Sequence, residues 1–92
     1  MKGKIFAVRL TSDRTFNFHD ETMGRGAMGL SIRNVGETNL IIDDAAQEEI
    51  APGEYFLVEN NIAIVNTDFR VKFKKDMNKR NDAVMRYIVP MD

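Results

Sequence analysis

A period-two alternation of apolar and polar residues recurs along most of the chain and limits the folds open to it. In residues 69–73 the apolar Phe69, Val71 and Phe73 alternate with basic residues. Successive side chains of a β-strand point to opposite faces, so this pattern is typical of half-buried strands. We expect Phe6, Val8 and Leu10 to share one face of a strand, and Phe16 and Phe18 to share another. The pattern also appears at residues 4–10, 15–18, 28–34 and 84–89.

Two segments, residues 40–42 and 56–58, are apolar at every position. A strand buried on both faces has this composition, which predicts central strands or strands covered by a partner. Turn residues separate the strands at intervals of about 8–12 residues, which is typical of a sandwich or barrel. In the turn at residues 51–54, Pro52 and Gly53 occupy the central positions favoured in type II turns. The other predicted turns lie at residues 34–37, 60–61 and 66–68.

These signals predict an all-β chain, a small β-sandwich or barrel of about eight short antiparallel strands. Periodicity does not reveal strand order, so a jelly-roll-like and an immunoglobulin-like topology both remain open. We interpret residues 75–86, the best helix candidate, as a polar loop followed by a strand, although Asp76 or Asp82 offers an N-cap. A single helical turn at residues 43–49 is a further alternative. The polar segments 19–27 and 74–82 are expected to be exposed, mobile loops.

The length of 92 residues predicts one domain, residues 1–92. A chain of this size buries only roughly 60–65% of its unfolded surface, so oligomerisation would help to stabilise it. It contains no Cys, which excludes disulfides and thiolate metal sites and fits a reducing compartment. Without a signal-peptide pattern or a run of ~20 apolar residues, we expect a soluble protein made in the cytoplasm, with no membrane partner.

Charge is distributed unevenly, although the net charge is only −1. Residues 37–54 contain six acidic residues and no basic one, whereas residues 69–86 contain seven basic and two acidic residues. Such segregation produces complementary patches. One interpretation is an ordinary solvated surface; the other is a contact between copies of the chain or with a partner. The candidate interaction residues are Asp43, Asp44, Glu48, Glu49, Arg70, Lys72, Lys74 and the loop residue Arg25.

The glycines Gly24, Gly26 and Gly29 have the G-x-G-x-x-G spacing of a dinucleotide-binding loop. In that motif the pyrophosphate is held by the N-terminus of the helix that follows the glycines. Here residues 28–34 alternate like a strand. We therefore interpret the glycines as relief for backbone with positive φ in a loop.

Catalytic and metal-binding combinations are sparse. His19 is the single histidine, and its neighbours Asp20 and Glu21 would point to different sides of an extended chain, which disfavours chelation. Neither Ser12 nor Ser31 lies in a G-x-S-x-G elbow. We therefore expect no enzyme activity, no catalytic residue, and neither a cofactor nor a metal.

Two binding alternatives follow from the charged segments. The pairs Asp43-Asp44 and Glu48-Glu49 suggest a cation-binding site, but their spacing does not match an EF-hand loop. The basic residues within 70–74 suggest nucleic-acid binding as a second alternative. There the alternating phenylalanines would face the core, so bases would find no stacking partner, and nucleic-acid binding is not expected.

The run SIRNVGETNLIIDDAAQEEIAPGEYFLV, residues 31–58, resembles small virion structural domains of tailed bacteriophages. In that pattern a strand ending in I-x-N-x-G precedes an aliphatic strand, and an I-x-P-G-E turn precedes an aromatic-aliphatic strand. The resemblance covers about a third of the chain and brings no catalytic residues. The matching positions are Ile32, Asn34, Gly36, Ile50, Pro52, Gly53 and Glu54.

The resemblance implies a non-enzymatic virion protein, made in the bacterial host cytoplasm, that decorates the capsid or joins head and tail. Its expected partners are other virion proteins, such as the major capsid protein, and further copies of itself. The alternative function is a small ligand-binding β-domain for carbohydrate or a cation. The absence of Trp disfavours carbohydrate.

Overall fold

The structure, a computed structural model, describes residues 2–59, 62–65 and 68–91. They form eight strands and one short helix, which confirms the predicted all-β class. The helix α1 spans Phe18–Glu21. The strands are β1 (Lys2–Leu10), β2 (Arg14–Phe16), β3 (Met28–Asn34), β4 (Leu40–Ile42), β5 (Glu48–Ile50), β6 (Tyr55–Leu57), β7 (Phe69–Phe73) and β8 (Ala83–Met91).

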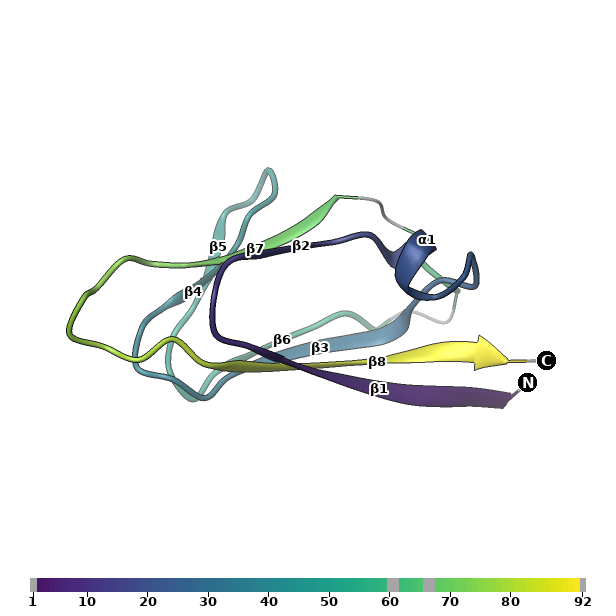
Figure 1. Cartoon of the computed structure of the whole chain (residues 1–92), viewed down its shortest axis with the longest axis horizontal. Helices are drawn as coiled ribbons and strands as arrows, with labels where there is room; N and C mark the ends of the chain where they lie inside the picture. The colour runs from purple at the N-terminus through teal and green to yellow at the C-terminus, as the bar shows by residue number, and fades with distance from the viewer. Residues whose placement is uncertain (1, 60–61, 66–67, 92) are drawn as a thin grey trace.

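The strands form two antiparallel four-stranded sheets packed face to face (Figure 1). Sheet I has the order β1-β8-β3-β6, and sheet II has the order β2-β7-β4-β5. Consecutive strands alternate between the two sheets, except that β4 and β5 both lie in sheet II, and the two strand orders are those of a jelly roll. This order decides between the two topologies that periodicity leaves open. Sheet I is the lower layer in Figure 1 and sheet II the upper one.

The core lies between the two sheets, and the period-two pattern places it correctly. Val71 and Phe73 of β7 are buried, whereas Arg70, which precedes Val71, is exposed. Phe16 and Phe18 are both buried and stack at a centroid distance of 5.8 Å, but Phe18 lies in α1 rather than in a strand. The rest of the buried apolar set is Leu10, Ala27, Leu30, Ile32, Leu40, Ile42, Ile50, Ala83, Met85, Tyr87 and Val89.

The two all-apolar segments have different positions. Residues 40–42 form β4, which lies between β7 and β5, so the prediction of a central strand is confirmed. Residues 55–57 form β6 at the edge of sheet I, where Leu57 is half exposed. Residues 56–58 are therefore not part of a central strand, and the alternative, a strand covered by a partner, stays a prediction. Strand position depends on chain topology, which local apolarity does not encode.

Both described turns form as expected. The amide of Glu54 donates to the carbonyl of Ala51 at 2.9 Å, and Gly53 has φ +87°, which together confirm the type II turn. The turn at residues 34–37 links β3 to β4. It depends on buried Asn34, whose Nδ2 donates to the carbonyls of Thr38 and Ile50. The predicted turn at 60–61 and the first two residues of the one predicted at 66–68 lie outside the described residues.

Residues 19–27, predicted to be an exposed loop, are partly buried and begin inside a helix. Asn17 caps α1: its side chain accepts from the Asp20 amide, and the Glu21 carboxylate accepts from the Asn17 amide. Buried Thr22 then ties the loop, because its Oγ1 donates to the Phe18 carbonyl and accepts from the Gly26 amide. Gly26 has φ +85°, and an added Cβ would lie 2.8 Å from that of Ala63.

The two remaining loop predictions have mixed outcomes. Residues 75–82 form a polar loop that leads into β8, as interpreted, but Asp82 at its end is buried rather than exposed. Residues 43–47 form a turn instead of the helical turn held open as an alternative. The Asp44 carboxylate accepts from the amides of Ala46 and Gln47, which closes the turn.

Candidate functional site

The predicted acidic and basic interaction residues meet within one chain, on the outer face of sheet II. This contact arises because β4 lies between β7 and β5. Arg70 Nε lies 3.1 Å from Asp43 Oδ2, and Lys72 Nζ lies 3.5 Å from Asp43 Oδ1. Lys74 Nζ lies 3.6 Å from Glu49 Oε1. Most of the basic charge of β7 is therefore matched internally, which leaves less of it for a phosphate or a partner.

Hydrogen bonds hold these carboxylates in their ionised form. A bond from Gln47 Nε2, at 2.7 Å, makes the largest contribution to lowering the pKa of Asp43, and the nearby Lys72 and Arg70 lower it further. A bond from Asn39 Nδ2 lowers the pKa of Glu49, with help from Lys74. A carboxylate that is stabilised as an anion is poorly suited to donating a proton near neutral pH.

Asp44 and Glu48 differ from Asp43 and Glu49, although all four lie in the same hairpin. Both are exposed, and neither forms an ion pair with any described residue. The turn between β4 and β5 projects from the upper layer in Figure 1. This acidic hairpin, residues 43–49, therefore carries negative charge at its tip that no described residue neutralises.

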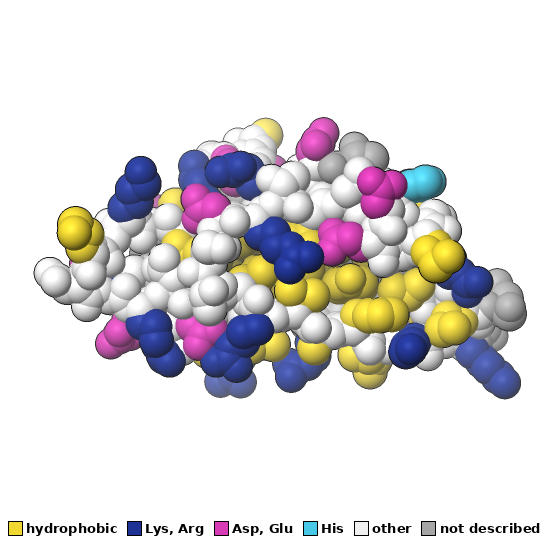
Figure 2. Space-filling model, in the orientation of Figure 1, with side chains coloured by type: hydrophobic (Ala, Val, Ile, Leu, Met, Phe, Trp, Pro, Cys, Tyr) yellow, Lys and Arg dark blue, Asp and Glu magenta, His cyan; other side chains and the backbone are white. Residues whose placement is uncertain are grey.

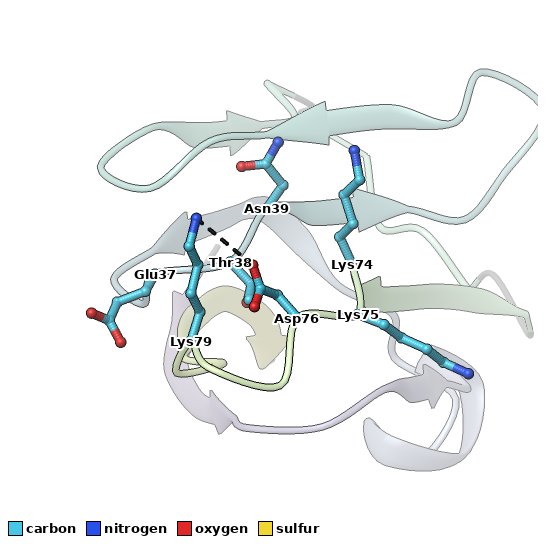
Figure 3. A pocket seen from close by; sticks show the side chains of 7 residues that line it. All are labelled: Glu37, Thr38, Asn39, Lys74, Lys75, Asp76 and Lys79. Atoms are coloured by element: carbon cyan, nitrogen blue, oxygen red, sulfur yellow. Dashed lines mark ion pairs between the residues drawn. The ribbon is translucent and has the colours of Figure 1, made fainter.

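A polar pocket of about 250 Å³ lies beside the loop after β7 (Figure 3). Its charged groups diverge: Lys79 and Asp76 pair at 3.8 Å, while Lys75 and Glu37 point away from them. The Thr38 hydroxyl already donates to Asn81 Oδ1. The side chains do not converge on a point where a substrate would react. The other lining residues are Asn39 and Lys74.

An apolar depression of about 210 Å³ lies where the ends of β1 and β8 meet the loop after α1. Phe6 and Met91 line it together with exposed Met23, and Lys4 and Arg25 lie at its margin. Figure 2 shows hydrophobic side chains gathered here, next to basic ones. Arg25, predicted to be an interaction residue, therefore lies apart from the charged residues of sheet II and next to apolar surface.

Strand β1 is a nine-residue edge strand that pairs only with β8, from Lys2 opposite Met91 to Leu10 opposite Ala83. Its other edge is free of any described strand. Most of β1 is exposed on both faces, with Ile5 at 69%. Phe6, predicted to share one face with Val8 and Leu10, is only partly covered: its ring stacks on Tyr87 at 5.8 Å but remains 38% exposed. The strand extends past the end of the sandwich, which the alternating pattern does not indicate.

Residues considered for catalysis or metal binding are not brought together. His19 Nδ1 lies 3.4 Å from Asp20 Oδ1, both on the surface, and Ser31 lies within β3. Within residues 2–59, 62–65 and 68–91, no group of three or more His, Asp or Glu is placed to hold a metal ion. No helix in that part of the chain is long and apolar enough to cross a membrane.

No family model matches the chain, and no curated protein or solved structure was found that matches it.

Proposed function

We propose that this chain is a non-enzymatic structural subunit of a tailed-phage virion, an auxiliary protein that decorates the capsid or joins head and tail. One observation carries the proposal: the free edge of β1 on a jelly-roll domain. An unpaired edge strand presents a row of backbone donors and acceptors and usually needs cover. Assembly provides such cover, either by added strands or by a packed neighbour.

The apolar surface next to that edge supports the same role. Ile5, Phe6, Met23 and Met91 are exposed around the β1–β8 end of the domain. Apolar patches on a small domain are typical of surfaces that bind other proteins. Jelly rolls are used in viral capsid proteins, among other classes, so the fold agrees with the proposal without selecting it.

The test is incorporation into particles. The purified chain is added to capsids of the phage that encodes it, assembled without this protein, and co-sedimentation is measured against concentration. We expect saturation at a fixed ratio to the major capsid protein. The matched variant pair is Ile5→Lys, next to the free edge of β1, and Lys75→Glu in the polar pocket. The first should lower binding at least about tenfold, and the second should not change it.

Absence of the chain from purified virions, together with no binding to such capsids, would rule out the proposal. A saturable interaction that Ile5→Lys does not weaken would place the contact elsewhere on the domain.

The alternative, a ligand-binding β-domain, has one feature in its favour. Tyr55 at the edge of sheet I is 67% exposed, and exposed aromatic rings pack against sugars. Titration calorimetry with glycans and with calcium separates this function from the first. Heat of binding that is lost in Tyr55→Ala would support carbohydrate recognition.

A further inference from the structure

The outer face of sheet I carries two arginines that have no carboxylate partner among the described residues. Arg33 of β3 and Arg86 of β8 are exposed on this face, in adjacent rows of the sheet register. The described ion pairs of arginine involve Arg9, Arg14, Arg70 and Arg80, so Arg33 and Arg86 form none with the described residues. We call this outer surface of sheet I the basic face; in Figure 1 it points down, away from sheet II.

Apolar and aromatic side chains surround the two arginines. Ile5 lies opposite Ile88, and Tyr55 lies opposite Arg33. Leu57 lies opposite Ser31, which is itself opposite Arg86. None of the described strand residues on this face is Asp or Glu. Tyr, Arg and large apolar residues with few acidic ones are the composition of a protein–protein interface.

The acidic hairpin has the complementary charge and a suitable shape. It projects from the sandwich on the side opposite the basic face, with Asp44 and Glu48 exposed and unmatched by any described cation. Ala45 and Ala46 at its tip are also exposed and small, so they permit close approach to a flat sheet. Each copy therefore offers one unmatched basic surface and one unmatched acidic projection, on opposite layers.

We propose that the basic face of one copy binds the acidic hairpin of a second copy. The contact uses two different surfaces, so it is heterologous and repeats from copy to copy, closing into a ring or continuing as a chain. It deepens the proposed function and rests on it, because a repeating contact of this kind serves a subunit of an assembly. A symmetric contact between two basic faces would instead bring arginines together, which is unfavourable.

Sedimentation velocity on a charge-swapped pair of variants tests the contact. Arg33→Glu with Arg86→Glu makes the basic face acidic. Ala45→Lys with Glu48→Lys turns the unmatched charge at the tip of the hairpin from negative to positive and keeps Asp44, whose carboxylate closes the turn. Alone, each variant opposes like charges and should have a dissociation constant at least about tenfold above that of the wild type. Mixed in equal amounts, the two variants should associate again.

Two controls accompany the swap. Lys75→Glu, a charge reversal away from both surfaces, should associate like the wild type. Raising the salt from about 0.1 M to 1 M shortens the screening length from about 10 Å to 3 Å and should weaken the association. Circular dichroism of each variant shows whether it is folded.

The proposal is overturned if the folded wild type stays monomeric at millimolar concentration and low salt. It is also overturned if the mixed variants do not recover association. Binding of a single-stranded oligonucleotide by a monomer, lost in Arg33→Glu with Arg86→Glu, would make the basic face a nucleic-acid surface instead. If the mixed variants do not recover association but the wild type is incorporated into virions, only this contact is rejected and the structural role stands. If the variants associate as expected but the chain is absent from virions and does not bind capsids, this contact is supported and the structural role is rejected.

Discussion

Arg9 near the end of β1 and Asp82 immediately before β8, 73 positions apart, form a bidentate ion pair. Arg9 Nε lies 2.6 Å from Asp82 Oδ1, and Arg9 Nη2 lies 2.6 Å from Oδ2. The carboxylate is almost fully buried while the guanidinium is mostly exposed. This ion pair links the edge strand β1 to the residue that precedes β8, the strand next to β1 in sheet I.

The Arg9–Asp82 pair should make stability depend on pH. The hydrogen bond from Arg9 lowers the pKa of Asp82, with the charges of Arg9 and Arg80 acting in the same direction. A carboxyl group whose pKa is lower in the folded state stabilises the fold above its unfolded pKa, about 3.9. That contribution is lost as the pH falls through the folded pKa.

We therefore expect the urea midpoint of the wild type to fall as the pH is lowered from about 5 to 2. The midpoint of Asp82→Asn should start lower at pH 7 and fall less over the same range. Glu59→Gln, at an exposed position, serves as the control and should keep the wild-type profile. An Asp82→Asn profile parallel to that of the wild type would show that the ion pair contributes nothing to the pH dependence.

Buried Asn34 should be among the polar residues most sensitive to substitution. Its Nδ2 donates to the carbonyls of Thr38 and Ile50, and its Oδ1 accepts from the Gly36 amide. Asn34→Ala leaves these backbone groups without partners and should lower the free energy of unfolding by about 2–4 kcal/mol. Asn39→Ala, which removes one surface bond, should lower it by about 1 kcal/mol or less. Equal losses measured by urea denaturation would contradict the assigned role of Asn34.

Much of the strand content was accessible from the sequence because the two faces of each strand have different surroundings. Residues 69–73 show this most clearly, since core and solvent alternate along β7. The order of the strands within each sheet could not be predicted, because no residue pattern in β4 indicates that β7 is its neighbour. The internal pairing of Asp43 with Arg70 follows from that order. The sequence therefore reveals the charge complementarity but not that both partners belong to one chain.

The helix α1 and the exposure of β1 were missed for different physical reasons. Asn17 is a residue type favoured at a helix N-cap, but only four helical residues follow, too few to show helical periodicity. Phe6 alternates correctly with its neighbours, yet β1 extends past the sandwich and no opposite sheet covers it. Periodicity shows which side chains share a face and does not show where that face ends.

The two faces of β8 should respond very differently to truncation. Met85 is fully buried between the sheets, whereas Ile88 is exposed on the basic face. Met85→Ala removes packed atoms from the core and should lower the free energy of unfolding by about 2–5 kcal/mol. Ile88→Ala should lower it by about 1 kcal/mol or less, since little buried surface is lost. Similar losses in thermal or urea denaturation would mean that the outer face is covered in solution.

Tryptic cleavage after Arg25 should report both the local fold and assembly. Arg25 is exposed, yet the loop on either side of it is held by the two hydrogen bonds of Thr22 Oγ1 and by the pairing of Ala27 with Ile64. A protease needs an extended segment, so cleavage requires local opening of this loop. Thr22→Val removes both side-chain bonds and should speed cleavage of the free chain severalfold.

In the assembled state, cleavage after Arg25 should slow, because Arg25 borders the apolar depression that we expect a neighbour to cover. The measurement is the rate of loss of intact chain, free and bound to capsids, with Arg25→Gln identifying the cut at this bond. If assembly does not change the rate, no neighbour protects the depression. Assembly would then depend on surfaces away from the depression, such as the basic face and the acidic hairpin. Both lie on the outer sides of the sandwich, away from the loop that carries Arg25.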